Sequence, residues 1–584
     1  MIRKIFRQML VTQILSAMTV MICMLIDSMM IGRFLGVDSM TAYGLANPVL
    51  LVFAAFGSML SAGIQVMCGK TVGIGDRDGT DACYSVSVVM AGAISAIGML
   101  LVLVFAEPIS TVLGAGKAAP DNPVFFLTRD YLRGFIIGAP AFIFAQVMVP
   151  FLQISAKRVQ LAVAVVLMTI SDIIFDLLNV FVFHGGTFGM GLASSLSYYI
   201  AFAAALPVFL HKDCLFHLRF SSVRRSLCRE LIGYGVPTVI NQISLVLLVF
   251  VFNKLLLQVG QNLAVAAYSV ISTVGNLCYC FGSGVASVAL LLSSIFFCDE
   301  DRSSLHTLVR TMCFYAVVLD LIVIAFVLLA APALVGIFLA DNLQAKDLAV
   351  KGLRLFSLSL LPCALNTSFK NYYQGINRTR FTEAISVMQN FLFPAAFAFV
   401  LSRFWHTDGV WLGYVCGESL TLLVISLVVW RQNRGVSFSA ETYSMLPADF
   451  GVPEEDCLEF TVRSEEEAAL ASDRAAAFCK AHADSEKNSM LISLCVEEMV
   501  FNILQHGFVK DKLEHSIELR ILYKDGGRVI RIRDNCVHFD PLEYLDLHKA
   551  DDPFAHFGIR MVMKMVKSAN YVNSLGLNNL TLFL

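Results

Sequence analysis

The sequence predicts an all-α polytopic membrane protein with twelve transmembrane helices in two six-helix bundles, followed by a cytoplasmic α/β two-layer domain. Of its 584 residues, 57% are hydrophobic and only 15% are charged, which is far more apolar than a typical soluble chain. Apolar stretches of about 20 residues, long enough to cross a bilayer, recur up to residue 434 and then stop. A lipid bilayer is therefore the first expected partner.

The predicted spans lie near residues 9–31, 44–68, 83–105, 131–154, 160–183, 189–210, 231–256, 264–296, 309–337, 350–374, 382–402 and 410–430. Lys and Arg are concentrated in the loops on one side, including Arg3, Lys157, Arg225 and Arg380. By the positive-inside rule that side is cytoplasmic. An even number of spans then places both termini in the cytoplasm and the protein in the plasma membrane.

The overall charge and the cysteines exclude other classes. The formal net charge is −2, from 43 basic and 45 acidic residues, so no basic field indicates nucleic acid binding. The 15 cysteines are scattered and form no repeated CxxC pattern of a zinc site or a disulfide framework. We interpret them as small buried side chains.

The membrane part contains an internal repeat. The segment YLRGFIIGAPAFIFAQVMVPFLQISAKR at residues 131–158 matches GLRLFSLSLLPCALNTSFKNYYQGINRTR at residues 352–380. The repeat divides the chain into an N-lobe at residues 1–222 and a C-lobe at residues 223–434. Two such bundles suit alternating access, in which the halves rock about a central cavity.

Acidic residues inside the spans are the main candidates for a functional site. Asp172 and Asp176 lie four residues apart in an apolar run and therefore share one helix face. A carboxylate at that depth costs on the order of 2.5–3.5 kcal/mol, so this face should line a cavity. Asp27 and Glu418 are further acids within spans. Asp27 could instead lie at a helix end, Asp172 could cap a helix, and Glu418 could pair with an interfacial group.

The run IDSMMIGRFLGVDSMTAYGLANPV and the later run DIIFDLLNVFVFHGGTFGMGLASSLS resemble the multidrug and toxic compound extrusion (MATE) transporters. The resemblance covers roughly residues 5–430. It implies export of amphipathic or cationic small organic substrates, driven by entry of Na⁺ or H⁺. It places the cation site at Asp27, Asp176 and Ser194, with Asp172 where the family more often has Asn.

After a polar linker at residues 435–456, residues 457–584 have the composition of a soluble domain. We predict a strand at LEFTVR, helices at residues 465–483 and 489–506, and a strand pair around the turn Asp525-Gly526-Gly527. A helix at residues 556–568 and one last strand complete the predicted two-layer α/β pattern.

This domain resembles the GHKL ATP-binding fold, in particular its anti-sigma-factor kinase branch. EEMVFNILQHG looks like the N-box, RDNCVHFDP like the adenine loop and HFGIRMVMKM like the second glycine box. The resemblance implies ATP with Mg²⁺, with Glu498 as general base, Asn502 as Mg²⁺ ligand, Asp534 on the adenine and Gly558 near phosphate. Cys536, His538 and His556 stand where glycines are common, and a degenerate domain without ATP binding is the alternative.

Three functions fit these features. The first is a cation-coupled antiporter whose tail binds nucleotide and regulates transport, or phosphorylates a partner protein as a serine kinase. The second is a membrane sensor with a kinase output. The third is a flippase for lipid-linked precursors, which should show basic residues in its cavity helices, and the helix centres lack them. ATP is not expected to drive transport directly, because no GxxxxGK[ST] motif is present.

Overall fold

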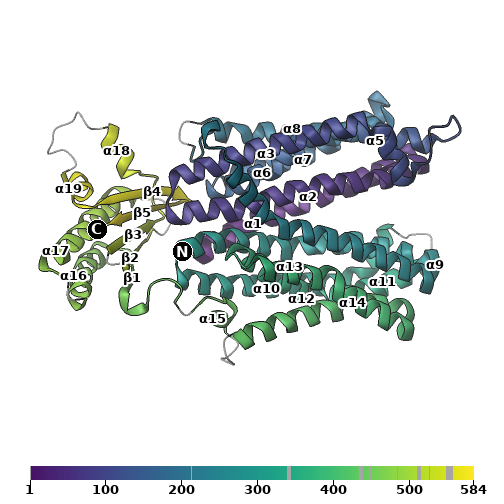
Figure 1. Cartoon of the computed structure of the whole chain (residues 1–584). Coiled ribbons are helices and arrows are strands. Elements are labelled where there is room, and N and C mark those ends of the chain that lie inside the picture. Colours follow the sequence, from purple (N-terminus) through teal and green to yellow (C-terminus); the bar gives the residue numbers. More distant parts are fainter. Residues whose placement is uncertain are drawn as a thin grey trace.

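The computed structural model consists of a long helical bundle with a smaller α/β domain at one of its ends (Figure 1). We call that end of the bundle the domain end. The structure describes residues 2–211, 214–338, 343–432, 439–447, 449–482, 484–508, 515–524, 527–547 and 557–584.

The N-lobe is built mainly from long apolar helices joined by short connections, and a π-helical turn follows three of its helices, at Ile31–Leu35, Thr111–Ala115 and Asn179–Phe183. Its helices are α1 (Ile2–Met30), α2 (Val37–Ile74), α3 (Arg77–Val104), α4 (Ala106–Ser110), α5 (Pro123–Ile136), α6 (Ala139–Ile154), α7 (Arg158–Leu178) and α8 (Gly186–Leu210).

The C-lobe contains α9 (Arg225–Cys298), α10 (Arg302–Phe338), α11 (Leu343–Ser357), α12 (Leu360–Gly375), α13 (Thr379–Val387) and α14 (Phe393–Gln432). The helical backbone of α9 continues through residues 257–263, where a loop was expected, but α9 contains two separate candidate spans, Arg225–Gly260 and Leu263–Cys298, as the sequence predicts. Among the described residues, nine helices could each cross a membrane, or up to eleven spans if each bent pair counts as one. The last of them, Thr379–Gln432, has non-helical backbone at Trp405 and His406.

The two lobes share a distinctive feature at matching places of the sequence repeat. Helices α5 and α6 meet at an angle of 46°, and α11 and α12 meet at 45°. Each bent pair ends in a turn with a left-handed residue, Ala156 at φ 55° and Asn377 at φ 66°. The repeat is therefore expressed in backbone geometry as well as in sequence.

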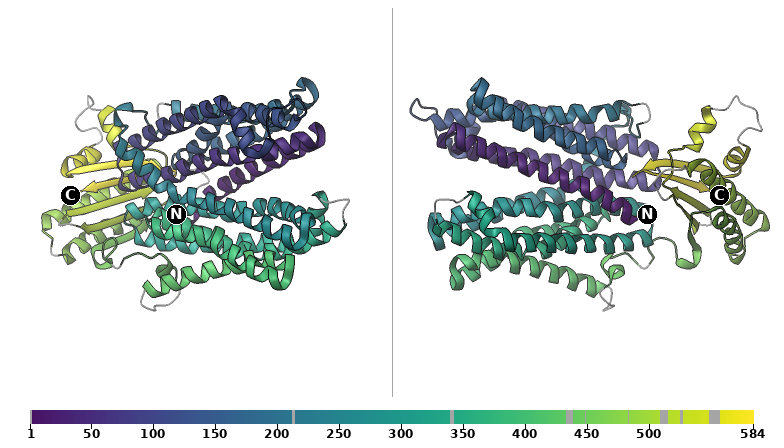
Figure 2. Two further views of the ribbon diagram at one scale, coloured as in Figure 1. Left: turned by 45° about the vertical axis from the view of Figure 1, so that its right-hand side comes forward. Right: turned by 180° about the vertical axis from the view of Figure 1, so that it is seen from behind.

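The lobes pack against each other along α2 and α9, and mainly near the domain end. Residues 62–69 of α2 and residues 288–296 of α9 are buried on every side, whereas Leu51, Val52 and Phe56 of α2 are exposed. In Figures 1 and 2 the two lobes lie close together near the domain and diverge away from it. The bundle is thus closed at its domain end.

Glycines allow this close approach. A Cβ atom added at Gly63 would lie 2.4 Å from the backbone oxygen of Leu231, and one at Gly73 would lie 2.4 Å from that of Ile295. Ser294 adds a hydrogen bond across the seam, from its Oγ to the oxygen of Gln65 at 2.8 Å. Small residues at such contacts are typical of helices that pack in membranes.

The C-terminal domain has a five-stranded antiparallel sheet in the order β1-β2-β3-β5-β4. Its elements are β1 (Cys457–Val462), α16 (Glu465–Ala481), α17 (Glu486–Gly507), β2 (Ile517–Lys524), β3 (Gly527–Asp534), α18 (Pro541–Leu547), α19 (Phe557–Met565), β4 (Ser568–Ser574) and β5 (Leu577–Phe583). Strand β4 and helix α18 were not predicted from the sequence. Polar residues such as Asn570 and Asn573 weaken the alternation of apolar and polar side chains in β4, so the sequence pattern did not indicate a strand there. Of the expected hairpin turn, Asp525 and Gly526 lie outside the described residues.

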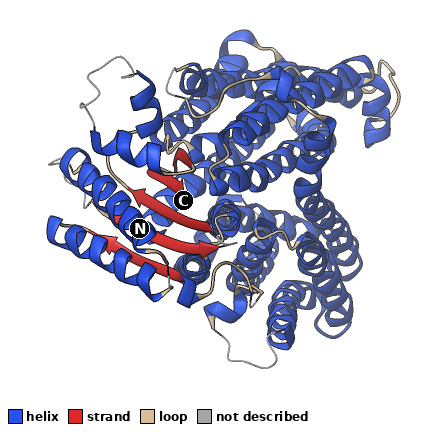
Figure 3. Cartoon of the chain, turned by 60° about the vertical axis from the view of Figure 1, so that its left-hand side comes forward, coloured by secondary structure: helices blue, strands red, loops and turns tan. Residues whose placement is uncertain are grey.

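Side chains of the sheet alternate between two environments. Leu519, Ile521, Ile530 and Ile532 are buried with α16 and α17 in one hydrophobic core. Figure 3 shows the sheet between these helices and the bundle. The opposite face of the sheet therefore points toward the membrane part of the chain.

The linker is tied to the C-lobe. It contains the short helix α15 (Ala440–Tyr443). The hydroxyl of Tyr373 donates to the oxygen of Tyr443 at 3.0 Å, and Arg302 Nη2 donates to the oxygens of Pro447 at 2.6 Å and Phe450 at 3.0 Å. The predicted linker is thus, where described, an anchored strap.

The seam makes a testable prediction. Replacing Gly63 by Val should lower the thermal stability of the purified protein in detergent, because the added methyl groups meet rigid backbone. Overpacking of this kind typically costs about 1–3 kcal/mol. The control is Gly44→Val in the same helix, since a Cβ atom at Gly44 meets nothing within 4 Å. Equal melting temperatures of the two variants would contradict close packing at the seam.

Candidate functional site

The N-lobe brings together the four residues that the sequence predicts for the cation site. Asp27 comes from α1, Asp172 and Asp176 come from α7, and Ser194 comes from α8. Ser194 Oγ donates a hydrogen bond to Asp27 Oδ2 at 3.2 Å. Both acids of α7 are within electrostatic range of Asp27. These four side chains therefore form one cluster across three helices.

The three carboxyl groups are deeply buried, with exposed fractions of 8% for Asp27, 2% for Asp172 and 0% for Asp176. The helix-end alternative for Asp27 and the capping alternative for Asp172 do not match this burial. Ser197 Oγ donates to Asp172 Oδ1 at 3.0 Å. In contrast, Asp27 Oδ1 and both oxygens of Asp176 have no hydrogen-bond partner in the described part of the chain.

Such unpaired oxygens fit a bound cation or proton, because an isolated buried carboxylate is very costly. None of the ion pairs between described residues involves Asp27, Asp172 or Asp176. Within the same residues, no three His, Cys, Asp or Glu side chains converge as a ready-made metal site. Protons need no such convergence, whereas Na⁺ would draw the carboxylates closer together.

Local backbone features position the cluster. One π-helical turn begins four residues after Asp27, and another begins three residues after Asp176. Such turns are frequent at functional sites. Asn179 begins the second turn. Its Nδ2 donates to the oxygen of Gly186 at 3.1 Å, and its Oδ1 accepts from the N–H of Gly185 at 3.1 Å. Asn179, which the sequence analysis did not select, thus ties the end of α7 to the start of α8.

The C-lobe holds a different polar network around Glu418, which is also buried. Asn366 Nδ2 donates to Glu418 Oε2 and to its backbone oxygen, both at 2.8 Å. Gln389 Nε2 donates to Glu418 Oε1 at 3.5 Å, and Gln389 Oε1 accepts from Lys370 Nζ at 3.2 Å. The Gln389 amide therefore bridges a buried acid and a buried base.

Two charged residues of the C-lobe were not selected from the sequence. Lys370 lies near the end of the predicted span 350–374, where a basic residue is usually interfacial, yet it is buried and also donates to Asn241. Asp320 lies in the middle of α10, and its Oδ2 has no hydrogen-bond partner among the described residues. An acid at the centre of an apolar span was a signal that could have found it.

In the C-terminal domain, Glu498 and Asn502 lie on α17 and both are half-buried. Gly558, near the start of α19, faces Glu498: a Cβ atom added there would lie 2.0 Å from Glu498 Oε2. The structure thus brings α17 and α19 together at these two residues. His556, the expected first residue of the second glycine box, lies outside the described residues.

Asp534 lies at the end of β3 and is buried. Its Oδ1 accepts hydrogen bonds from Asn578 Nδ2 at 2.8 Å and from the N–H of Cys536 at 3.0 Å. Burial raises the pKa of the Asp534 carboxyl, while these hydrogen bonds act in the opposite direction. The carboxyl is held as a fixed acceptor, which fits the expected contact with the amino group of adenine.

Comparison with known families matches residues 13–178 and 237–400 to the MatE family, and residues 461–583 to the histidine kinase-like ATPase domain. The two MatE segments begin at residues 13 and 237, an offset of the same size as that of the sequence repeat.

The chain is also similar to individual proteins. It is 20% identical over 394 residues to the multidrug export protein MepA of Staphylococcus aureus (strain NCTC 8325), covering 67% of this chain and 85% of MepA. It is 22% identical over 443 residues to the probable multidrug resistance protein YoeA of Bacillus subtilis (strain 168), covering 73% and 93%. The crystal structure of a mutant of the Vibrio cholerae MATE transporter VcmN superimposes with a TM-score of 0.68 at 17% identity, covering 76% and 98%.

The C-lobe network makes a prediction about stability. Replacing Asn366 by Leu should lower the melting temperature in detergent, because Glu418 loses its two closest hydrogen bonds. A buried group left unsatisfied costs about 1–3 kcal/mol, and more when charged. The double variant Asn366→Leu with Glu418→Gln should recover part of the loss. If the double variant is no more stable than the single one, the carboxylate is not the origin of the penalty.

Proposed function

Because the chain belongs to the MatE family, we propose that it is a secondary transporter that exports drug-like organic compounds, amphipathic or cationic in character, in exchange for an entering cation. The observation that carries this proposal is the buried cluster of Asp27, Asp172 and Asp176, which has no ion-pair partner among the described residues. The names of MepA and YoeA, which describe multidrug export and resistance, support the substrate class.

The coupling mechanism follows from the cost of burying charge. When bound, Na⁺ or H⁺ supplies the positive charge that offsets the carboxylates. Ser194 holds Asp27 and Ser197 holds Asp172, while Asp176 keeps both oxygens free to receive the cation. Neutralising the cluster favours one arrangement of the lobes and emptying it favours the other, which is all that coupling requires.

We further propose that the domain end faces the cytoplasm and that both termini lie there, with the protein in the plasma membrane. The excess of Lys and Arg in the loops at this end supports that orientation. The full twelve-span count follows if the 54-residue segment Thr379–Gln432 crosses twice, turning at Trp405 and His406. The closed domain end then gives an arrangement open to the outside.

A second function is proposed for the C-terminal domain, namely binding of ATP with Mg²⁺. The contact between Glu498 and Gly558, with Asn502 one turn along α17, favours it. In this arrangement Asp534 receives the adenine, Asn502 ligates Mg²⁺ and Glu498 is the general base. The nucleotide then regulates transport, or serves to phosphorylate a partner protein. In the alternative sensor function the bundle detects a ligand and the domain is a kinase output.

The flippase alternative has weaker support. It expects basic side chains in the cavity helices, and the buried Lys370 is the relevant candidate. However, its ammonium group is bonded to Asn241 and Gln389 inside the C-lobe. The positive charge of Lys370 therefore interacts with side chains of the protein itself.

The proposed transport mechanism makes a prediction about Asp176. Replacing it by Asn should abolish gradient-driven transport of a dye such as ethidium in membrane vesicles, because the cluster loses its least paired carboxylate. Separate Na⁺ and H⁺ gradients identify the coupling ion in the wild type. Asp38→Asn, an exposed acid at the start of α2, is the matched control and should leave transport unchanged. Undiminished transport by Asp176→Asn, with protein present in the membrane, would refute the mechanism.

The proposed nucleotide site makes a prediction about ATP binding. Titration of the purified full chain with a fluorescent ATP analogue and Mg²⁺ should show saturable binding that Asp534→Ala removes, since the adenine amino group loses its acceptor. Asp473→Ala on α16 serves as a control, because this acid is exposed. Absence of binding by the wild type would indicate the degenerate alternative.

A further inference from the structure

The open face of the sheet carries charged residues that meet the C-lobe. Arg531 Nη1 lies 2.6 Å from Asp299 Oδ1, and Arg533 Nη2 lies 2.8 Å from Asp299 Oδ2. Lys524 pairs with Glu300 at 2.7 Å. Both acids belong to the short segment between α9 and α10, so the sheet is attached to the domain end of the C-lobe.

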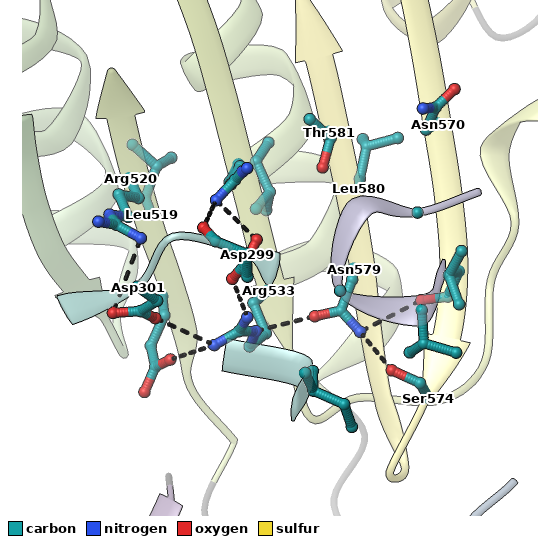
Figure 4. A pocket seen from close by; sticks show the side chains of 18 of the residues that line it. Asp299, Asp301, Leu519, Arg520, Arg533, Asn570, Ser574, Asn579, Leu580 and Thr581 are labelled. Carbon is teal, nitrogen blue, oxygen red and sulfur yellow. Dashed lines mark hydrogen bonds and ion pairs between the residues drawn. The ribbon is translucent and has the colours of Figure 1, made fainter. Parts of the chain in front are cut away.

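Figure 4 shows the pairs that Asp299 and Asp301 make with arginines of the sheet. Both carboxylates are buried, whereas the pair of Lys524 with Glu300 is exposed. Burial alone would raise the pKa of Asp301, but Arg520 and Arg533, together with hydrogen bonds from Ser304, outweigh it and lower the pKa. Removing one partner of a buried pair is strongly destabilising. Together with the anchored linker, the ion pairs hold the domain to the C-lobe at several places.

The same sheet also touches the N-lobe, through the turn that joins β4 and β5. We call residues Ser574, Leu575 and Gly576 the hairpin tip. The N–H of Leu575 donates to the oxygen of Ile154, the last residue of α6, at 2.6 Å. Arg158 Nη2, at the start of α7, donates to the oxygen of Leu575 at 3.3 Å. The tip therefore closes over the connection between two N-lobe helices.

The hairpin tip also packs against the bundle through its apolar side chain. The Leu575 side chain is only 4% exposed and belongs to the hydrophobic cluster of the bundle, not to the core of its own domain. At Gly576, with φ 77°, a Cβ atom would lie 3.2 Å from that of Ala156. Val572 and Leu577 of the same hairpin also belong to the hydrophobic cluster of the bundle. In addition, an ion pair joins Arg77 of α3 to Asp540 at 3.4 Å.

We propose that the β4–β5 hairpin is a latch that holds the two lobes together at the domain end. Opening of this end must move Ile154 and Arg158 away from the segment at residues 299–301, yet one sheet binds both. The C-lobe side has many buried ion pairs and the covalent strap. The N-lobe side has two hydrogen bonds at the hairpin tip, three buried apolar side chains of the hairpin and one ion pair whose arginine is exposed, and no covalent link, so it is the contact that releases.

The latch is connected to the proposed nucleotide site. Asn578, two residues after the tip, donates both to Asp534 Oδ1 at 2.8 Å and to the oxygen of Val537 at 3.0 Å. Arg533 Nε donates to Asn579 Oδ1 at 2.8 Å, and Asn579 Nδ2 donates to Ser574 Oγ at 3.3 Å. Nucleotide bound at Asp534 therefore changes how strongly the hairpin tip binds the N-lobe. This second step rests on the proposed nucleotide binding.

The test measures the distance between the lobes in the purified full chain. Spin labels are placed on cysteines introduced at Val159 on α7 and Arg380 on α13, which are exposed residues in the first turns of corresponding helices. None of the 15 native cysteines is exposed, which favours selective labelling. Leu575→Asp should at least double the population with the longer distance, because it places a charge in the buried contact.

The matched control is Leu470→Asp, the same substitution at a side chain on α16 that is 54% exposed. It should reproduce the wild-type distances. If Leu575→Asp fails to fold, Arg158→Ala replaces it, with a smaller shift in the same direction. Distances equal to those of the control in a folded latch variant would overturn the proposal.

Adding the fluorescent ATP analogue with Mg²⁺ to the labelled wild type tests the second step. A changed distance distribution that Leu575→Asp no longer shows supports coupling through the latch. If the ATP analogue binds but the distance between the lobes does not change, the coupling between nucleotide and latch is overturned, while the proposed nucleotide site stands. Absence of binding refutes the nucleotide site, and the result with Leu575→Asp still decides on the latch.

Discussion

The close packing of α2 against α9 determines the arrangement of the whole chain. Glycines at Gly63 and Gly73 let the two backbones approach, and this contact closes the bundle at one end only. The acid cluster of the N-lobe and the polar network of the C-lobe then lie in separate halves that can move as bodies. The same closed end forms the surface on which the C-terminal sheet docks. A wider seam would therefore also change this docking surface.

The chain buries charge in three ways. At the sheet, Asp299 and Asp301 face arginines and are paired. In the C-lobe, Glu418 and Lys370 share the amide of Gln389, so neither charge is isolated. In the N-lobe, Asp176 has no partner among the described residues. A buried pair is satisfied within the protein, whereas an unpaired carboxylate needs something from outside. Asp320 of the C-lobe also has one unpaired oxygen, but it is a single acid, whereas the N-lobe gathers three carboxyl groups. This difference is the physical reason to propose ion coupling in the N-lobe.

The sequence predicted those parts that depend on local or periodic information. The spacing of Asp172 and Asp176 placed them on one face of α7, and the repeat matched the two segments that form the bent helix pairs, although the bends themselves were not predicted. It could not predict contacts between distant segments. The bond between Asn366 and Glu418 joins two helices, and the pairing of Arg531 with Asp299 joins two domains. β4 was missed because polar residues weaken its alternation, and Lys370 because its partners are far away in sequence.

The anchored strap has a consequence for the strength of the hairpin contact. Because α15 is fixed to the C-lobe, the domain is tethered beside the N-lobe, and the tip meets its binding surface at an effective concentration on the order of millimolar. An interface too weak to form between separate molecules is then occupied most of the time. It can also dissociate quickly enough to break in every transport cycle. Cutting the strap would therefore weaken the contact without altering any residue that makes it.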